Sequence, residues 1–84
     1  MSVQLRRDVL FTRTEYGGVL LDEAKGIYWR LNPVGATVVR AMVEADMDNL
    51  VRQLVKTFDV DAAVAVRDVD ELLVQLRDAG LTVS

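Results

Sequence analysis

The sequence predicts an α+β fold in which a three-stranded antiparallel sheet is followed by three helices. Two observations carry this prediction. Short turns at Gly17-Gly18 and at Gly26 join three consecutive apolar segments, which favours a meander of neighbouring strands. At Asn32-Pro33 the spacing of apolar residues then changes from a repeat of two to a repeat of 3.6, which is typical of helices.

The predicted strands cover approximately residues 5–12, 18–22 and 27–31. In the third, Ile27, Trp29 and Leu31 alternate with Tyr28 and Arg30, so the two sets point to opposite faces of the sheet. We expect this strand to lie at an edge of the sheet. We also expect Trp29 and its two companions to face the core, because large aromatic side chains dominate core burial.

The predicted helices cover approximately residues 33–45, 47–58 and 62–79. Asn32 suits the cap of the first helix, and Pro33 suits its first position because no hydrogen-bond partner is needed there for the missing N–H. Gly80 is expected in the left-handed position that ends the third helix. A chain of 84 residues supports one modest core, so residues 1–84 are predicted to form a single domain.

The composition excludes most catalytic chemistry. The chain has no cysteine and no histidine, which removes thiol nucleophiles, imidazole bases and soft metal ligands. Carboxylate sites for magnesium or calcium remain conceivable, but no Asp-x-Asp-x-Asp-Gly loop is present. We therefore expect no catalytic residues, no metal, no cofactor and no enzymatic activity.

The charge and the apolar runs restrict the partners. No apolar run approaches the roughly 20 residues of a membrane helix, and the charged start of the chain is unlike a signal peptide, so we expect a cytoplasmic protein without membrane contact. Three strands and three helices also fit a winged helix-turn-helix, a fold that often binds DNA. However, residues 59–84 hold six acidic and two basic residues, which argues against nucleic acid.

The third predicted helix carries a second row of side chains beside its core stripe. Val64, Asp68 and Leu72 form this row, and Glu71 and Gln75 continue it. A single exposed valine is ordinary, so the row gains meaning only from what lies opposite. If this helix packs beside the edge strand, the row and the residues Tyr28 and Arg30 would line a cleft.

Three segments of the chain together resemble a known family. They are Gly18 to Asp22, Gly26 to Gly35, and Asp68 to Leu73 with the closing Ala79-Gly80-Leu81. They resemble the PqqD-like proteins, which are recognition elements for the precursors of ribosomally made and modified peptides (RiPPs). Within this family, Tyr28 to Pro33 is most similar to the stand-alone leader-binding proteins of lasso-peptide biosynthesis. A pyrroloquinoline-quinone-type peptide chaperone remains the alternative.

The resemblance implies a non-catalytic module that binds a peptide by strand addition. In this family the precursor's leader peptide pairs with the edge of the third strand, against the third helix. The expected partners are the leader, a leader peptidase and a macrolactam-forming cyclase. The expected peptide-binding residues are Tyr28, Leu31, Val64 and Leu72 as apolar walls, Arg30, Asp68 and Gln75 as polar contacts, and Trp29, which we place mainly in the core.

Overall fold

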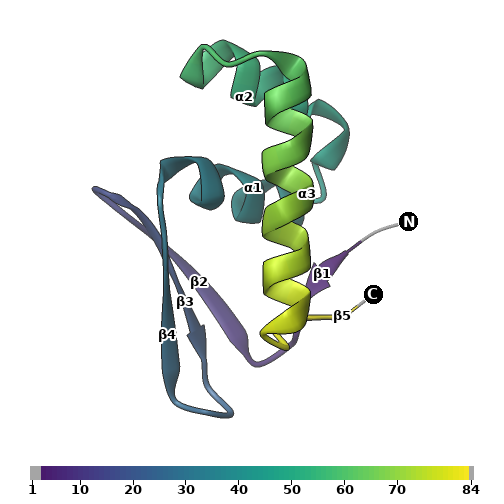
Figure 1. The fold of residues 1–84 in the computed structure, drawn as a ribbon. Coiled ribbons are helices and arrows are strands. Elements are labelled where there is room, and N and C mark those ends of the chain that lie inside the picture. The colour runs from purple at the N-terminus through teal and green to yellow at the C-terminus, as the bar shows by residue number, and fades with distance from the viewer. Residues whose placement is uncertain (1–2, 84) are drawn as a thin grey trace.

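The structure is a computed structural model that describes residues 3–83 (Figure 1). Along the chain lie β1 (Gln4–Leu5), β2 (Val9–Thr14), β3 (Gly17–Asp22), β4 (Ile27–Leu31), α1 (Pro33–Val43), the 3-10 helix η1 (Met47–Asn49), α2 (Leu50–Phe58), α3 (Ala62–Asp78) and β5 (Thr82–Val83). A three-stranded antiparallel sheet precedes three α-helices, so the predicted fold class is confirmed.

The sheet has the strand order β2-β3-β4, and the helices cover one of its faces. Leu20 of β3 lies opposite Phe11 of β2 and Trp29 of β4, so these three side chains share a face. Leu20 is fully buried there. Gly18 is on the same face, where a Cβ would lie 2.7 Å from the Phe11 ring and 3.3 Å from Ala36 of α1. We call this helix-covered side the inner face.

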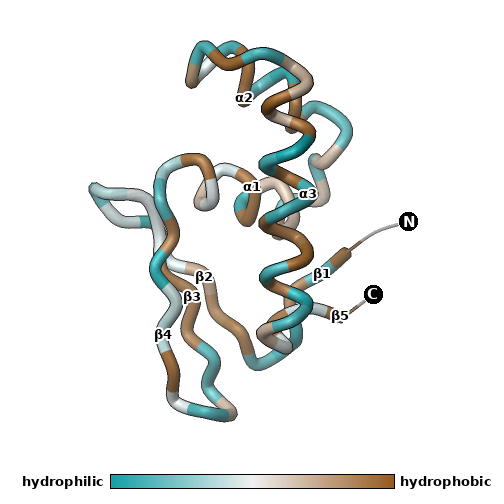
Figure 2. The backbone as a smooth tube through the Cα atoms, in the orientation of Figure 1, coloured by the Kyte–Doolittle hydropathy of each residue, from teal (hydrophilic) through white to brown (hydrophobic). Residues whose placement is uncertain are grey.

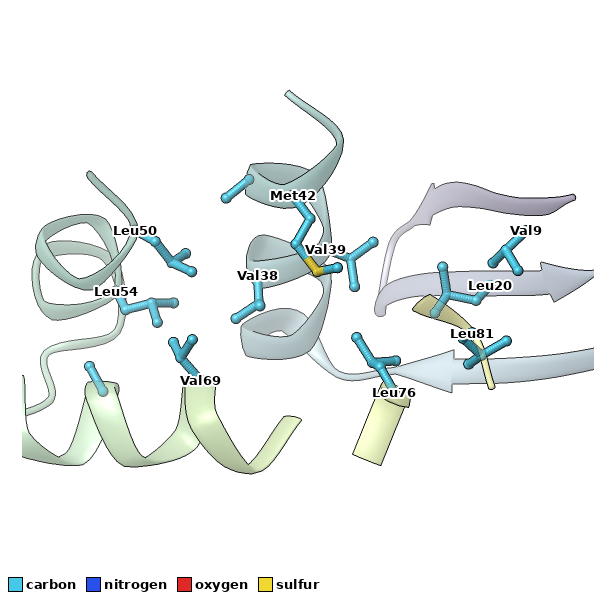
Figure 3. Packing of buried hydrophobic residues seen from close by; sticks show 12 residues of the cluster. Val9, Leu20, Val38, Val39, Met42, Leu50, Leu54, Val69, Leu76 and Leu81 are labelled. Atoms are coloured by element: carbon cyan, nitrogen blue, oxygen red, sulfur yellow. The ribbon is translucent and has the colours of Figure 1, made fainter. Parts of the chain in front are cut away.

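The hydrophobic core fills the space between the inner face and the three helices. It comprises Val9, Leu20, Val38, Val39, Ala41, Met42, Leu50, Leu54, Ala65, Val69, Leu76 and Leu81. Figure 3 shows Val38 of α1 near Leu54 of α2 and Val69 of α3. Hydrophobic and hydrophilic segments alternate along α3, as expected of a helix with one buried side (Figure 2).

The predicted first strand at 5–12 is wrong because the chain turns between its two halves. β1 pairs with β5, and β2 begins only at Val9. The turn is closed by the Val9 N–H, which donates to the Arg6 carbonyl at 3.0 Å. At this turn the Arg6 guanidinium donates a hydrogen bond to the carboxylate of Asp22, the last residue of β3, at 2.7 Å. A pattern of alternating residues does not reveal this long-range ion pair.

Two residues with left-handed backbone end the first and second helices. α1 stops at Val43, short of the predicted 45, and Ala45 has a φ of 56°. The second helical segment begins as η1, becomes α2 at Leu50 and ends before Asp59, whose φ is 54°. α3 ends at Asp78, and the expected left-handed Gly80 follows with a φ of 74°. No helix within residues 3–83 is long and apolar enough to cross a membrane.

Candidate functional site

β4 is an edge strand, and its pairing register decides which of its backbone groups are free. Glu23, just after β3, donates its N–H to the Asp8 carbonyl at 3.0 Å, so the odd-numbered residues of β3 direct their backbone groups toward β2. The even-numbered residues of β3 therefore bond to β4. Their partners on β4 are Ile27, Trp29 and Leu31. The N–H and C=O groups of Tyr28 and Arg30 consequently point away from β3, toward the open edge.

Ile27, Trp29 and Leu31 of β4 lie on the inner face as expected, but the cleft expected around Tyr28 and Arg30 is not found. Trp29 is on the inner face with Leu20, which is also the side of α3, whereas Tyr28 and Arg30 are on the outer face. The expectation that Tyr28 and Arg30 line a cleft with α3 is therefore wrong. The expectation of a core position for Trp29 is also wrong, because this side chain is 41% exposed. An edge strand has no neighbour on one flank, which leaves even its inner side chains partly uncovered.

A groove lies where β4 runs into α1, and α3 forms its other wall. It has a volume of about 280 Å³. Its lining residues are Asn32, Val34 and Gly35 on one wall and Asp68, Glu71, Leu72 and Gln75 on the other. Apolar side chains, amides and carboxylates thus face the same space, and Asn32 at its margin directly follows the last residue of β4.

Capping of α1 shapes the first wall of the groove. The Asn32 side chain accepts a hydrogen bond from the Gly35 N–H at 2.7 Å, which confirms the predicted cap. A Cβ at Gly35 would lie 3.2 Å from the Asn32 side-chain oxygen, so glycine keeps the cap uncrowded. The helix therefore starts at Pro33, separated from the end of β4 by one residue, with Val34 in its first turn.

The hairpin between β2 and β3 supports this strand-to-helix junction from behind. Gly17 has a φ of 140°, and a Cβ there would lie 2.2 Å from the Leu31 carbonyl oxygen and 2.7 Å from the Asn32 carbonyl carbon. Only glycine allows this approach of backbone to backbone. The direction in which β4 leads into the groove is thus fixed by contact with Gly17.

The structure brings three of the expected binding residues together in the groove and leaves the others outside its lining. Asp68, Leu72 and Gln75 line it. Val64 is half-buried near the start of α3 and does not line it. Arg30 and Leu31 line a second pocket of about 440 Å³, beside the β2–β3 hairpin. Tyr28 and Trp29 line neither, although both stand on the edge strand.

Four groove residues are absent from the expected site: Asn32, Val34, Gly35 and Glu71. The first three sit in the junction between strand and helix, where the sequence signals a cap and gives no sign of a binding role. Glu71 follows Asp68 by three positions, which places both on one side of α3. The sequence already placed Glu71 in the row on this helix, but Glu71 was not among the expected binding residues.

The arrangement offers two kinds of contact to a ligand. The edge of β4 provides backbone donors and acceptors for a further strand, and the groove provides side-chain contacts on the inner side of that strand. Residues 3–83 contain no group of three or more His, Cys, Asp or Glu side chains placed to hold a metal ion. This combination of contacts suits an extended peptide.

The comparisons with known proteins agree with this geometry. No curated protein matches the chain. A solved structure described as lasso peptide synthetase B1 complexed with the leader peptide matches with a TM-score of 0.88 and 28% identity, over 100% of both chains. TbiB1 in complex with the TbiA(beta) leader peptide matches in fold with a TM-score of 0.83 and 22% identity, over 94% of this chain and 93% of that one.

The family comparison covers most of the chain. The family model described as coenzyme PQQ synthesis protein D (PqqD) matches residues 17–81, from the start of β3 through α3 to the residue before β5. This region includes the edge strand and every residue that lines the groove. The chain belongs to the PqqD family.

Proposed function

We propose that the chain is a non-catalytic module that binds the leader of a ribosomally made precursor peptide. The leader adds as a strand to β4, and its inward side chains enter the groove beside α3. The observation that carries this proposal is the open edge of β4 next to that groove. The full-length likeness to a protein solved with a leader peptide supports it. The bound precursor is then presented in the cytoplasm to a leader peptidase and a macrolactam-forming cyclase.

Backbone pairing supplies only part of the required free energy. Each added hydrogen bond contributes about 0.5–1.5 kcal/mol net, while ordering a disordered segment costs about 2–5 kcal/mol or more. Side-chain anchors must therefore supply specificity. Ile27 and Trp29 on the inner face are 47% and 41% exposed, so a leader strand has apolar area to cover beside β4.

The residues of the groove and of the edge strand take roles that follow from their faces. Leu72 and Val34 receive apolar leader side chains in the groove, while Asp68 and Gln75 contact polar ones. Trp29 and Leu31 adjoin the inward side chains of the leader. Tyr28 and Arg30 adjoin its outward side chains. Val64 contacts the leader only if the leader extends along α3 toward its first turn.

A proline at position 30 tests strand addition without cutting the sheet. The Arg30 N–H points away from β3, so Arg30→Pro removes a donor that only an added strand uses. The probe is a fluorescein-labelled synthetic leader peptide, called here the cognate leader, whose sequence is to be taken from a short precursor reading frame sought by sequencing the genomic neighbourhood of the gene. We expect micromolar or tighter binding by fluorescence anisotropy, a loss of tenfold or more (about 1.4 kcal/mol) for Arg30→Pro, and a smaller loss for the control Arg30→Ala. Equal affinity of Arg30→Pro and Arg30→Ala would exclude pairing at this edge.

A pyrroloquinoline-quinone-type peptide chaperone is the second candidate, because the matching family model is described as coenzyme PQQ synthesis protein D. Both candidates use the same edge and groove and differ in the peptide they hold. A competition experiment between the cognate leader and a PQQ precursor peptide separates them. Displacement of the cognate leader by a PQQ precursor at equal concentration would favour the chaperone.

A further inference from the structure

The groove beside α3 is negatively charged. Two of its lining residues, Asp68 and Glu71, carry carboxylates, and its described lining includes no lysine or arginine. Asp68 is half-buried and Glu71 is exposed. Within residues 3–83 no ion pair joins either carboxylate to a basic side chain. Both negative charges are therefore available to a ligand in the groove.

The other side of the same edge is positively charged. Arg30 is exposed on the outer face, where it lines a separate pocket with Thr14 and Val19. Among the described residues it forms no ion pair with an acidic side chain. The two sides of the β4 edge thus carry opposite charge, with Asp68 and Glu71 inside and Arg30 outside.

A strand added to β4 presents successive side chains to these two sides in turn. Its backbone bonds are the same in every register, so they do not determine which residues point inward. A slip of one residue exchanges the inward and outward sets. Opposite charges across neighbouring strands attract, whereas like charges directly opposite repel. The charges beside β4 therefore distinguish the two registers of a charged peptide.

We propose that the site selects a leader segment with a lysine or arginine among the side chains that face α3, and an acidic or uncharged residue at the next position, beside Arg30. The cation pairs with Asp68 and Glu71 and sets the register of the whole leader. A slip of one residue removes this pairing and places the cation against Arg30. This inference rests on the proposed function, because it requires the leader to be an added strand on β4.

The experiment measures the affinity of the cognate leader by anisotropy at about 0.15 M ionic strength. The protein variant is D68N/E71Q, which removes both charges at nearly constant shape. Its matched control is Asp70→Asn, on the same helix but outside the groove lining. We expect D68N/E71Q to weaken binding about tenfold and Asp70→Asn to change it less than about twofold.

The peptide arm identifies the cation. Each lysine and arginine of the cognate leader is replaced in turn by glutamine. One replacement should weaken binding to the native chain about tenfold and have less than about a twofold effect on D68N/E71Q, because the two changes remove the same interaction. The charge-swapped pair should restore binding: a leader with glutamate at that position, tested against Asp68→Lys combined with Glu71→Lys.

Three results would overturn this inference. One is a leader with every lysine and arginine replaced that binds the native chain as tightly as the unmodified peptide. Another is additive losses from the peptide and protein changes, since additivity means that the cation and the carboxylates do not meet. Either result leaves leader binding itself intact. The third is failure of the unmodified leader to bind the native chain. That result overturns the proposed function and, with it, the proposed pairing of a leader cation with Asp68 and Glu71.

Discussion

Trp29 is the side chain whose removal reports most clearly on the inner side of the edge strand. It is 41% exposed, and a tryptophan side chain presents roughly 250 Å² at most, so about 100 Å² is open to solvent. If a leader covers this area, the transfer free energy is about 2.5 kcal/mol at 25 cal/mol per Å². Trp29→Ala should therefore weaken leader binding by up to about 70-fold.

Tyr28→Ala is the matched control for Trp29→Ala. Tyr28 is the adjacent aromatic residue on the same strand, and it is 69% exposed on the outer face, where a leader strand leaves it largely in solvent. A cross-strand contact there is worth about 1 kcal/mol at most, which limits the loss to about fivefold. Isothermal titration calorimetry with the cognate leader measures both variants, after circular dichroism has shown that each remains folded.

The native chain provides an independent readout of the same claim. Trp29 is the only tryptophan of the sequence, so emission excited at the long-wavelength edge, where the two tyrosines absorb little, reports on the inner side of β4. Covering the indole with a leader should shift its emission to shorter wavelength as water leaves it. The reasoning is refuted if Trp29→Ala binds the leader within about twofold of the native chain, or if its loss does not exceed that of Tyr28→Ala.

Three further changes test the framework that holds the site. Arg6→Met should lower the free energy of unfolding by about 3 kcal/mol in urea titrations, because it leaves the carboxylate of Asp22, which is 1% exposed, without its ion-pair partner. The control Asp8→Asn removes the exposed acidic partner of Arg6 and should lower it by less than about 1 kcal/mol. Equal losses for the two variants would contradict this account. Gly17→Ala should cost about 3 kcal/mol or more by the same assay, since its Cβ meets the Leu31–Asn32 backbone, whereas Gly26→Ala, with a φ of 67° and open space around the Cβ, should cost about 1–2 kcal/mol. Leu72→Ala should weaken leader binding about tenfold through lost apolar contact in the groove. The control Leu73→Ala, on the same helix but outside the groove lining, should mainly lower the stability of the fold. A larger loss of binding for Leu73→Ala than for Leu72→Ala would mean that the leader does not occupy the groove.

The sequence was sufficient for the features that depend on neighbouring residues. The strand at 27–31 and the cap at Asn32 follow from local alternation and local hydrogen bonding, and the structure has both. The two turns likewise gave the meander of β2, β3 and β4. Local rules are reliable here because the interactions that they describe span four residues or fewer.

The features that depend on distant residues were not predictable in the same way. Alternation placed Trp29 on the core side of the sheet, but it did not show that the position at the open edge leaves this side chain 41% exposed, or that Tyr28 and Arg30 lie on the face away from α3. The Arg6 side chain at the turn before β2 pairs with Asp22, which lies sixteen positions away in the sequence. Which residues line the groove depends on how α3 packs opposite Asn32. The sequence therefore identified the row on α3 but not the residues of the wall that it faces.

The central claim is that a leader pairs with the open edge of β4. Amide hydrogen exchange by NMR tests it residue by residue, with and without saturating cognate leader. The N–H groups of Tyr28 and Arg30 point away from β3, so we predict that both exchange rapidly in the free chain and become strongly protected in the complex. The N–H groups of Ile27 and Trp29, already paired with β3, should change little in comparison. Unchanged exchange at Tyr28 and Arg30 in a saturated complex would contradict strand addition at β4.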